Sequence, residues 1–170
     1  NIVFHPEAIP SGVAALKAMS LAFEECETEV LADEIDQTAV LNDLRIATAR
    51  FEKERPHELN PEFHLSHLLT ALFSLMARAD RPADERGLAL AGRLAAAPRF
   101  LADAQTTLTR PARTFTETAL QVAEGGRTLL AEGIPSFAER TGPQVRAALA
   151  VALPLARAAV GREPVPGHGE

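Results

Sequence analysis

The sequence predicts an all-α protein in which about six helices form an antiparallel array with no sheet. Proline and glycine mark recurrent breaks along the 170 residues, and the segments between them have helix length. Within these segments apolar residues recur at helical spacing, and none alternates with the period of two that is typical of strands. The chain has eight Phe and no Trp or Tyr, so its core must consist mainly of Leu, Ala and Val, which favours closely packed helices.

The size and composition indicate one globular domain. The chain is 46% hydrophobic and 24% charged, which is ordinary for a folded domain of this length. We expect an extended lead-in over residues 1–10, because Pro6 and Pro10 oppose an early helix. A single helical domain should follow over residues 11–160, and residues 161–170, rich in Pro and Gly, should form a flexible tail.

Two helices are predicted before residue 55. Ser11 is placed to cap the first, which should run to about residue 30, and Asp36 to cap the second, over about 37–54. Asn60-Pro61 then predicts a third helix over about 61–79, with Asn at the N-cap and Pro at the first helical position. This helix has the strongest apolar pattern of the chain and should be central.

Three further helices are predicted in the second half. The fourth follows Arg81-Pro82, runs to about residue 108, and should be kinked or broken by Pro98. The fifth, about 112–132, contains Gly125-Gly126, which marks a break or a place where the backbone of another helix approaches closely. The sixth should cover about 143–160.

The charge pattern argues against some partners. The formal net charge is −6, and the acidic excess lies in residues 1–60. Nucleic acids and anionic membrane surfaces require clustered Lys and Arg, so we expect neither as a partner. The most apolar run, residues 147–156, is too short to cross a bilayer, and no secretory signal is present, so a cytoplasmic location is the default expectation. Cys26 is the only cysteine, which excludes an intrachain disulfide.

The best candidate for a polar pocket lies at the start of the third helix. His64 and His67 are three residues apart, on neighbouring positions of one face, and Glu62 is nearby. Such a pair could contribute to a metal site, but half-buried histidines bonded to a neighbouring helix are the simpler interpretation. We therefore predict no metal ligand and no catalytic residue in the chain.

Other metal patterns are weaker still. Glu54-x-x-His57 has the spacing of a di-metal carboxylate motif, but Pro56 interrupts the helix that would orient both ligands. The acidic stretch 24–36 lacks the central glycine of a calcium loop and is better interpreted as a solvated helix end and turn. The sequence has no His-Glu-x-x-His motif, phosphate loop or dinucleotide fingerprint.

Residues 28–160 carry an ordered set of structural positions that matches a known pattern. The positions are Ile35-Asp36, Leu41, Leu44-Arg45, Phe51-Glu52, Asn60-Pro61, Leu69, Leu72, Arg78, Pro82, Glu85-Arg86, Arg93-Leu94, Pro98-Arg99-Phe100-Leu101, Ala104, Leu108, Pro111, Glu117-Thr118-Ala119, Gly125-Gly126, Leu129-Leu130, Pro135 and Phe137. This order resembles the N-terminal helical half of the bacterial domain of unknown function 885 family, whose members look like all-helical zinc metallopeptidases.

The resemblance implies a function that this chain does not carry alone. In that family the metal motif, of the type His-Glu-x-x-x-x-His, lies in the C-terminal half, and zinc is implied for the full-length protein only. The chain begins at Asn1 rather than Met, so we expect a removed segment or a piece of a longer chain. The implied partner is the C-terminal half of the same protein, against which these helices would form a lid or cleft wall.

Two alternatives stay open. One is a stand-alone interaction module, with a homodimer as a possible form. The other is a small helical enzyme or ligand carrier with a pocket around His64, His67 and a carboxylate.

Overall fold

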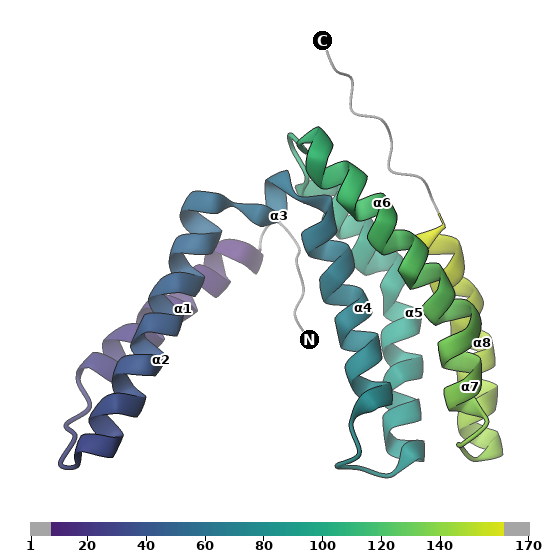
Figure 1. Cartoon of the computed structure of the whole chain (residues 1–170), viewed down its shortest axis with the longest axis horizontal. Helices are drawn as coiled ribbons and strands as arrows, with labels where there is room; N and C mark the ends of the chain where they lie inside the picture. The colour runs from purple at the N-terminus through teal and green to yellow at the C-terminus, as the bar shows by residue number, and fades with distance from the viewer. Residues whose placement is uncertain (1–7, 162–170) are drawn as a thin grey trace.

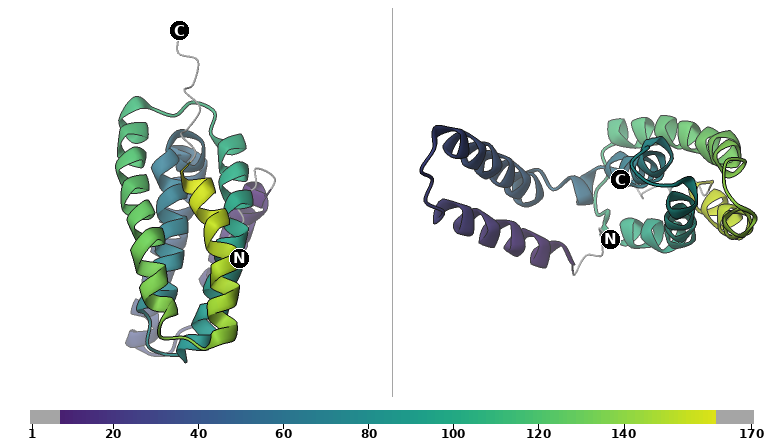
Figure 2. Two further views of the ribbon diagram at one scale, coloured as in Figure 1. Left: turned by 90° about the vertical axis from the view of Figure 1, so that its right-hand side faces the viewer. Right: turned by 90° about the horizontal axis from the view of Figure 1, so that it is seen from below.

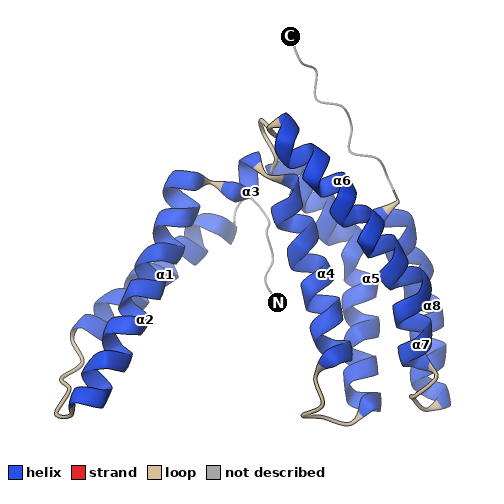
Figure 3. Cartoon of the chain, viewed as in Figure 1, coloured by secondary structure: helices blue, strands red, loops and turns tan. Residues whose placement is uncertain are grey.

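The computed structural model describes residues 8–161, and the regular structure in that range is helical throughout (Figure 1, Figure 3). Its six long helices are α1 (Ala8–Glu24), α2 (Leu31–Ala49), α4 (Pro61–Ala77), α5 (Ala83–Thr107), α6 (Arg113–Thr128) and α8 (Pro143–Val160). Two short helices, α3 (Pro56–Leu59) and α7 (Ile134–Ala138), and two π-helical turns, η1 (Arg50–Glu54) and η2 (Leu129–Gly133), connect them. The predicted all-α fold is confirmed.

The helices form two parts. Helices α4, α5, α6 and α8 make a bundle, and α1 and α2 form a hairpin, here called the limb, that extends away from it (Figure 1). Helices that follow one another along the bundle run antiparallel, whereas α5 and α8 lie side by side in the same direction, as do α4 and α6 (Figure 1, Figure 2). The short α3 joins the limb to the bundle.

The hydrophobic core lies in the bundle alone. Its buried members are Leu65, Leu68, Leu72, Leu90, Ala91, Leu94, Ala97, Ala123, Leu130, Ile134, Phe137, Val145, Leu149, Ala152, Ala156 and Val160. Leucine and alanine dominate this set, as the shortage of aromatic residues predicts. The limb shares no residue with this core, so the prediction of a single domain over residues 11–160 stays a prediction.

The closest packing in the bundle is between α5 and α8. A Cβ atom on Gly87 of α5 would overlap Cγ1 of Val145 on α8 and would lie 3.4 Å from Cγ2 of Thr141. Leu90 and Leu94, one and two turns further along α5, are completely buried. The two helices can approach this closely only because the contact position on α5 has no side chain.

Arginine side chains tie the bundle helices together through backbone carbonyls. Arg86 of α5 donates to the carbonyl oxygens of Leu75 and Met76 at 3.1 and 2.9 Å, near the end of α4. Arg157 of α8 donates to the carbonyl of Leu130 at 2.8 Å in the π-helical turn η2. The last carbonyls of a helix lack intrahelical partners, and the residue five positions after Leu130 is Pro135, which has no N–H to donate, so these contacts satisfy groups that would otherwise need water.

The prediction of an extended lead-in over residues 1–10 is wrong for its last three residues. Helix α1 begins at Ala8, and Pro10 lies in its first turn. Backbone N–H groups in a first turn make no hydrogen bond within the helix, so a proline costs none at this position. Ser11 is therefore inside the helix rather than at its cap, and its hydroxyl donates to the carbonyl of Ala8 at 2.8 Å. Residues 1–7 lie outside the described residues, as do residues 162–170 of the predicted tail.

The boundary between the two limb helices also differs from the prediction. Helix α1 ends earlier than residue 30 and α2 begins at Leu31, so Asp36 lies inside α2 rather than at its cap. The side chain of Gln37 donates to the carbonyls of Phe23 and Cys26 at 2.5 and 2.8 Å and holds the turn between the helices. This contact joins two helices, so local spacing could not predict it.

The predictions made at prolines and glycines of the bundle are confirmed only in part. Asn60 caps α4 as predicted, because its side chain accepts from the backbone N–H of Glu62 at 2.9 Å. Pro98 does not break α5, which continues from Ala83 to Thr107. At Gly126 a Cβ would lie 2.8 Å from Cδ1 of Leu69, so the close neighbour here is a side chain of α4 rather than the predicted backbone of another helix.

Two glycines of α5 provide a matched test of the α5–α8 contact. Gly87→Ala should lower the free energy of unfolding by about 1–3 kcal/mol, because the new methyl group overpacks the core against Val145. Gly92→Ala should raise it by about 0.5–1 kcal/mol, because nothing lies within 4 Å of the added Cβ and alanine is the better helix former. Urea unfolding measures both, and equal effects of the same sign would contradict the packing described.

Candidate functional site

The three predicted site residues lie on the first two turns of α4. Asn60 and Pro61 start this helix and fix the direction in which its first side chains leave the backbone. His64 is buried, whereas Glu62 and His67 are half-buried. Each of the three has a different principal partner.

The His64 imidazole points into the protein toward α3. The residue is 2% exposed, and its Nε2 lies 2.8 Å from the carbonyl oxygen of His57. Because a carbonyl can only accept, Nε2 carries the proton and donates to it. Burial lowers the pKa of His64 below its ordinary value, and the hydrogen bond to His57 opposes this effect without cancelling it. The simpler interpretation, a histidine bonded to a neighbouring helix, therefore describes His64.

His67 and Glu62 are engaged within α4 itself. Nδ1 of His67 donates to the carbonyl of Phe63 at 2.7 Å, and the two rings lie 4.3 Å apart between centroids. The Glu62 carboxylate accepts from the hydroxyl of Ser66 and lies 3.4 Å from Nδ2 of Asn60. The role of Glu62, His64 and His67 as one polar pocket stays a prediction, and these contacts hold each side chain in a local structural position.

A second buried histidine, His57, was not among the predicted site residues. It is 4% exposed, its ring lies 5.6 Å from that of Phe51, and its Nε2 lies 3.4 Å from the Glu58 carboxylate. Burial lowers the pKa of His57, and the neighbouring carboxylate opposes that shift. Its Nδ1 is buried with no hydrogen-bond partner among residues 8–161. The Glu54-x-x-His57 spacing marks this residue in the sequence, but its burial depends on tertiary packing that the local sequence does not indicate.

The Glu54-x-x-His57 pattern does not form one helical face. Glu54 ends the π-helical turn η1, and Arg55 follows in the left-handed conformation with a φ of 49°. Pro56 then starts α3, on which His57 lies. The interruption expected at Pro56 is present one residue earlier, so the spacing has no geometric meaning as a ligand pair.

His57 lines a pocket of about 290 Å³ between the start of α1, helix α3 and the end of α5. The lining residues are Ile9, Pro10, Arg55, His57, Glu58, Thr106, Thr107 and Thr109. Arg55 and Glu58 form an ion pair at 2.5 Å, so the charges of this pocket balance. Hydroxyls, an imidazole and an ion pair suit hydrogen bonding to a small polar molecule.

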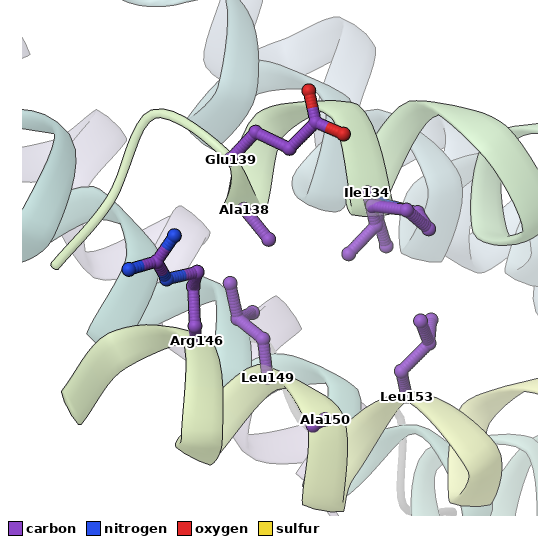
Figure 4. A pocket seen from close by; sticks show the side chains of 8 residues that line it. Ile134, Ala138, Glu139, Arg146, Leu149, Ala150 and Leu153 are labelled. Carbon is purple, nitrogen blue, oxygen red and sulfur yellow. The ribbon is translucent and has the colours of Figure 1, made fainter. Parts of the chain in front are cut away.

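A second pocket, of about 270 Å³, lies between α7 and α8 and is mainly apolar (Figure 4). None of the predicted residues Glu62, His64 and His67 lines either of these two pockets. Within the described part of the chain, no group of three or more His, Cys, Asp or Glu side chains is placed to hold a metal ion. None of the helices in that part has both the length and the apolar character needed to span a bilayer.

Comparison with known proteins shows the fold and no family. No family model matches the chain, and no curated protein matches it. A solved structure, a candidate lipoprotein of unknown function from Shewanella oneidensis, has a TM-score of 0.80 at 15% identity. The match covers 94% of this chain but only 30% of that one, so this chain spans less than a third of its structural neighbour. The resemblance to the domain of unknown function 885 stays a prediction.

Protonation of His64 should make stability depend on pH. The pKa of the folded state lies below the ordinary 6.5, so the unfolded chain binds the proton more readily. The stabilisation is complete above the unfolded pKa and is lost as the pH falls through 6.5 toward the lower folded pKa. His64→Gln keeps an Nε2–H donor for the His57 carbonyl but cannot be protonated. The loss of stability between about pH 7.5 and 5 should therefore be smaller in this variant.

Urea unfolding at several pH values measures this difference. The His57 imidazole, whose pKa is also lowered by burial, stays in both proteins, so the pH dependence should shrink without vanishing. An identical pH dependence in His64→Gln and the original chain would show that His64 does not carry the effect.

Proposed function

We propose that this chain is the N-terminal helical part, a lid or cleft wall, of a larger metal-dependent hydrolase of the peptidase type. The reacting groups and the zinc would lie in residues beyond this chain. The peptidase assignment is supported by the resemblance described above. The role as one part of a larger protein is supported by the structural neighbour, whose chain is more than three times as long as the matching region.

The observation that carries the proposal is the exposed apolar surface of the limb. Only Leu44 of the limb is buried, and it lies outside the core cluster. The large apolar side chains exposed on the limb and its turn are Met19, Leu21, Val30, Leu31, Ile35 and Ile46. By their spacing Leu31, Ile35 and Ile46 share one face of α2, and an exposed apolar face of this kind marks an interaction site. A hairpin with such a surface, held away from its own bundle, is suited to cover a substrate path.

The joint between limb and bundle is fixed on the bundle side. The backbone N–H of Thr109 donates to the carbonyl of Glu58 at 3.0 Å, and that of Ala112 donates to the carbonyl of Leu59 at 3.3 Å. These bonds attach α3 to the connection between α5 and α6. On the limb side, Lys17 and Glu52 form an exposed ion pair at 2.6 Å, which contributes little to stability. The direction of the limb is therefore set chiefly by the segment 50–55.

An interaction module without enzymatic function is the second candidate, and the same limb surface favours it. The two differ in what covers the limb: the rest of the same polypeptide in the first, a second copy or another protein in the second. A cytoplasmic location stays a prediction, since the structural neighbour is described as a candidate lipoprotein.

The first test compares residues 1–170 alone with the polypeptide that includes the proposed catalytic part. Residues 1–170 alone should show no peptidase activity and no tight zinc binding, whereas the polypeptide encoded by the whole reading frame should bind zinc and hydrolyse peptides. Zinc titration with a chromophoric competitor and a peptide hydrolysis assay measure both. Stoichiometric zinc binding to residues 1–170 at micromolar or lower concentration would contradict the proposal.

The second test concerns the limb as a lid in the whole polypeptide. Ile35→Glu places a charge on its exposed apolar surface and should change kcat/KM for a long peptide relative to a short one by about tenfold, equivalent to about 1.4 kcal/mol. Thr118→Glu adds the same charge at an exposed polar position of α6, outside the limb, and should leave the ratio unchanged. If Ile35→Glu also leaves the ratio unchanged, the limb does not select substrates.

A further inference from the structure

Helix α8 is apolar around most of its circumference. Its core-facing side chains are Val145, Leu149, Ala152, Ala156 and Val160. The outer face consists of Ala147, Ala150, Val151, Pro154, Leu155 and Ala158, all of them exposed. Val151 is 74% exposed and Leu155 50%. Gln144, Arg146 and Arg157 are the only polar side chains of this helix, so its outer face presents apolar side chains that another element could cover.

The apolar face continues into the pocket between α7 and α8. Ala150 belongs to both, and the pocket is otherwise lined mainly by aliphatic side chains of the two helices, including Ile134 of α7 and Leu153 of α8 (Figure 4). Its two charged lining residues are Glu139 and Arg146, which come from opposite walls. Together, the outer face of α8 and this pocket form one surface, here called the α7–α8 surface.

We propose that the α7–α8 surface binds an amphipathic helix from another part of the same polypeptide. A groove between two helices takes apolar side chains spaced three and four residues apart on a bound helix. The small side chains of Ala147, Ala150 and Ala158 allow the backbone of that helix to approach closely. Arg146 and Glu139 favour a helix with an acidic residue and a basic residue beside its apolar stripe.

Two observations favour the same polypeptide over a separate partner. The matching fold makes up only 30% of the chain of the structural neighbour, so a fold of this kind occurs with much additional chain. The outer face of α8 carries no charged side chain and the adjoining pocket carries only Glu139 and Arg146, which suits an apolar permanent interface, whereas the exposed apolar residues of the limb lie among acidic side chains such as Asp33 and Glu34. The inference rests on the proposed role as one part of a longer polypeptide and does not depend on hydrolase activity.

Cysteine labelling tests whether this surface is covered. Cys26 is exposed and is replaced by Ser, after which Val151→Cys provides one reactive thiol on the outer face of α8. The rate of reaction with N-ethylmaleimide is measured in residues 1–170 and in the polypeptide of the whole reading frame. We expect the longer polypeptide to react at least about tenfold more slowly, because the thiol reacts only when the bound helix opens. Thr118→Cys, at an exposed polar position of α6, should react at similar rates in both.

Each other outcome overturns the proposal. Equal labelling rates for Val151→Cys in the two polypeptides would show that nothing in the longer chain covers the surface. If the Val151→Cys thiol already reacts slowly in residues 1–170, and more slowly as the protein concentration rises, a second copy of the chain covers the surface. If the reading frame encodes no helix-forming sequence besides residues 1–170, the proposed bound helix does not exist. Labelling does not report on zinc or hydrolysis, so failure of the hydrolase proposal is distinguished from failure of this one.

Discussion

The first turns of α5 determine how the bundle is assembled. Gly87 allows α8 to approach at Val145, while the adjacent Arg86 donates to the last carbonyls of α4 and lies over the ring of Phe137 at 5.3 Å. One turn earlier, Asp84 accepts from the backbone N–H of Gly142 at 2.7 Å, directly before α8. A short segment of one helix thus fixes the end of α4, the position of α7 and the start of α8. The parallel contact of α5 with α8 follows, because both helices start from the same end of the bundle.

The buried histidines belong to the joint between the limb and the bundle. His57 lies on α3, and its carbonyl accepts from His64 of α4, so the two residues link the joint to the first turns of the bundle. Both imidazoles have lowered pKa values because they are buried, which keeps them neutral near physiological pH. Neutral imidazoles at buried positions avoid the cost of an unpaired buried charge. Their arrangement is explained by this structural role, without a reaction.

Local signals predicted the helix starts in the bundle and failed where distant residues decide the outcome. Asn60-Pro61 begins α4 as predicted, and α8 begins at Pro143, the first residue of its predicted range, because capping and the fixed φ of proline act within one turn. The limb boundary was misplaced because Gln37 reaches across to the end of α1. The candidate site had the same limitation: spacing placed His64 on one face of α4, but only the fold shows that this face meets the carbonyl of His57.

The molecule exposes two apolar surfaces that differ in how firmly they are held. Helix α8 is fixed by the core, and Arg157 links it to the carbonyl of Leu130, so its outer face is a rigid surface. The limb contributes nothing to that core, and it meets the bundle at the segment with the left-handed Arg55 and at the start of α1, where Ile9 and Pro10 line a pocket with the end of α5. Elements with few buried contacts move at a low free-energy cost, whereas core helices move only when the domain unfolds. A permanent interface therefore suits α8, and a contact that opens and closes suits the limb.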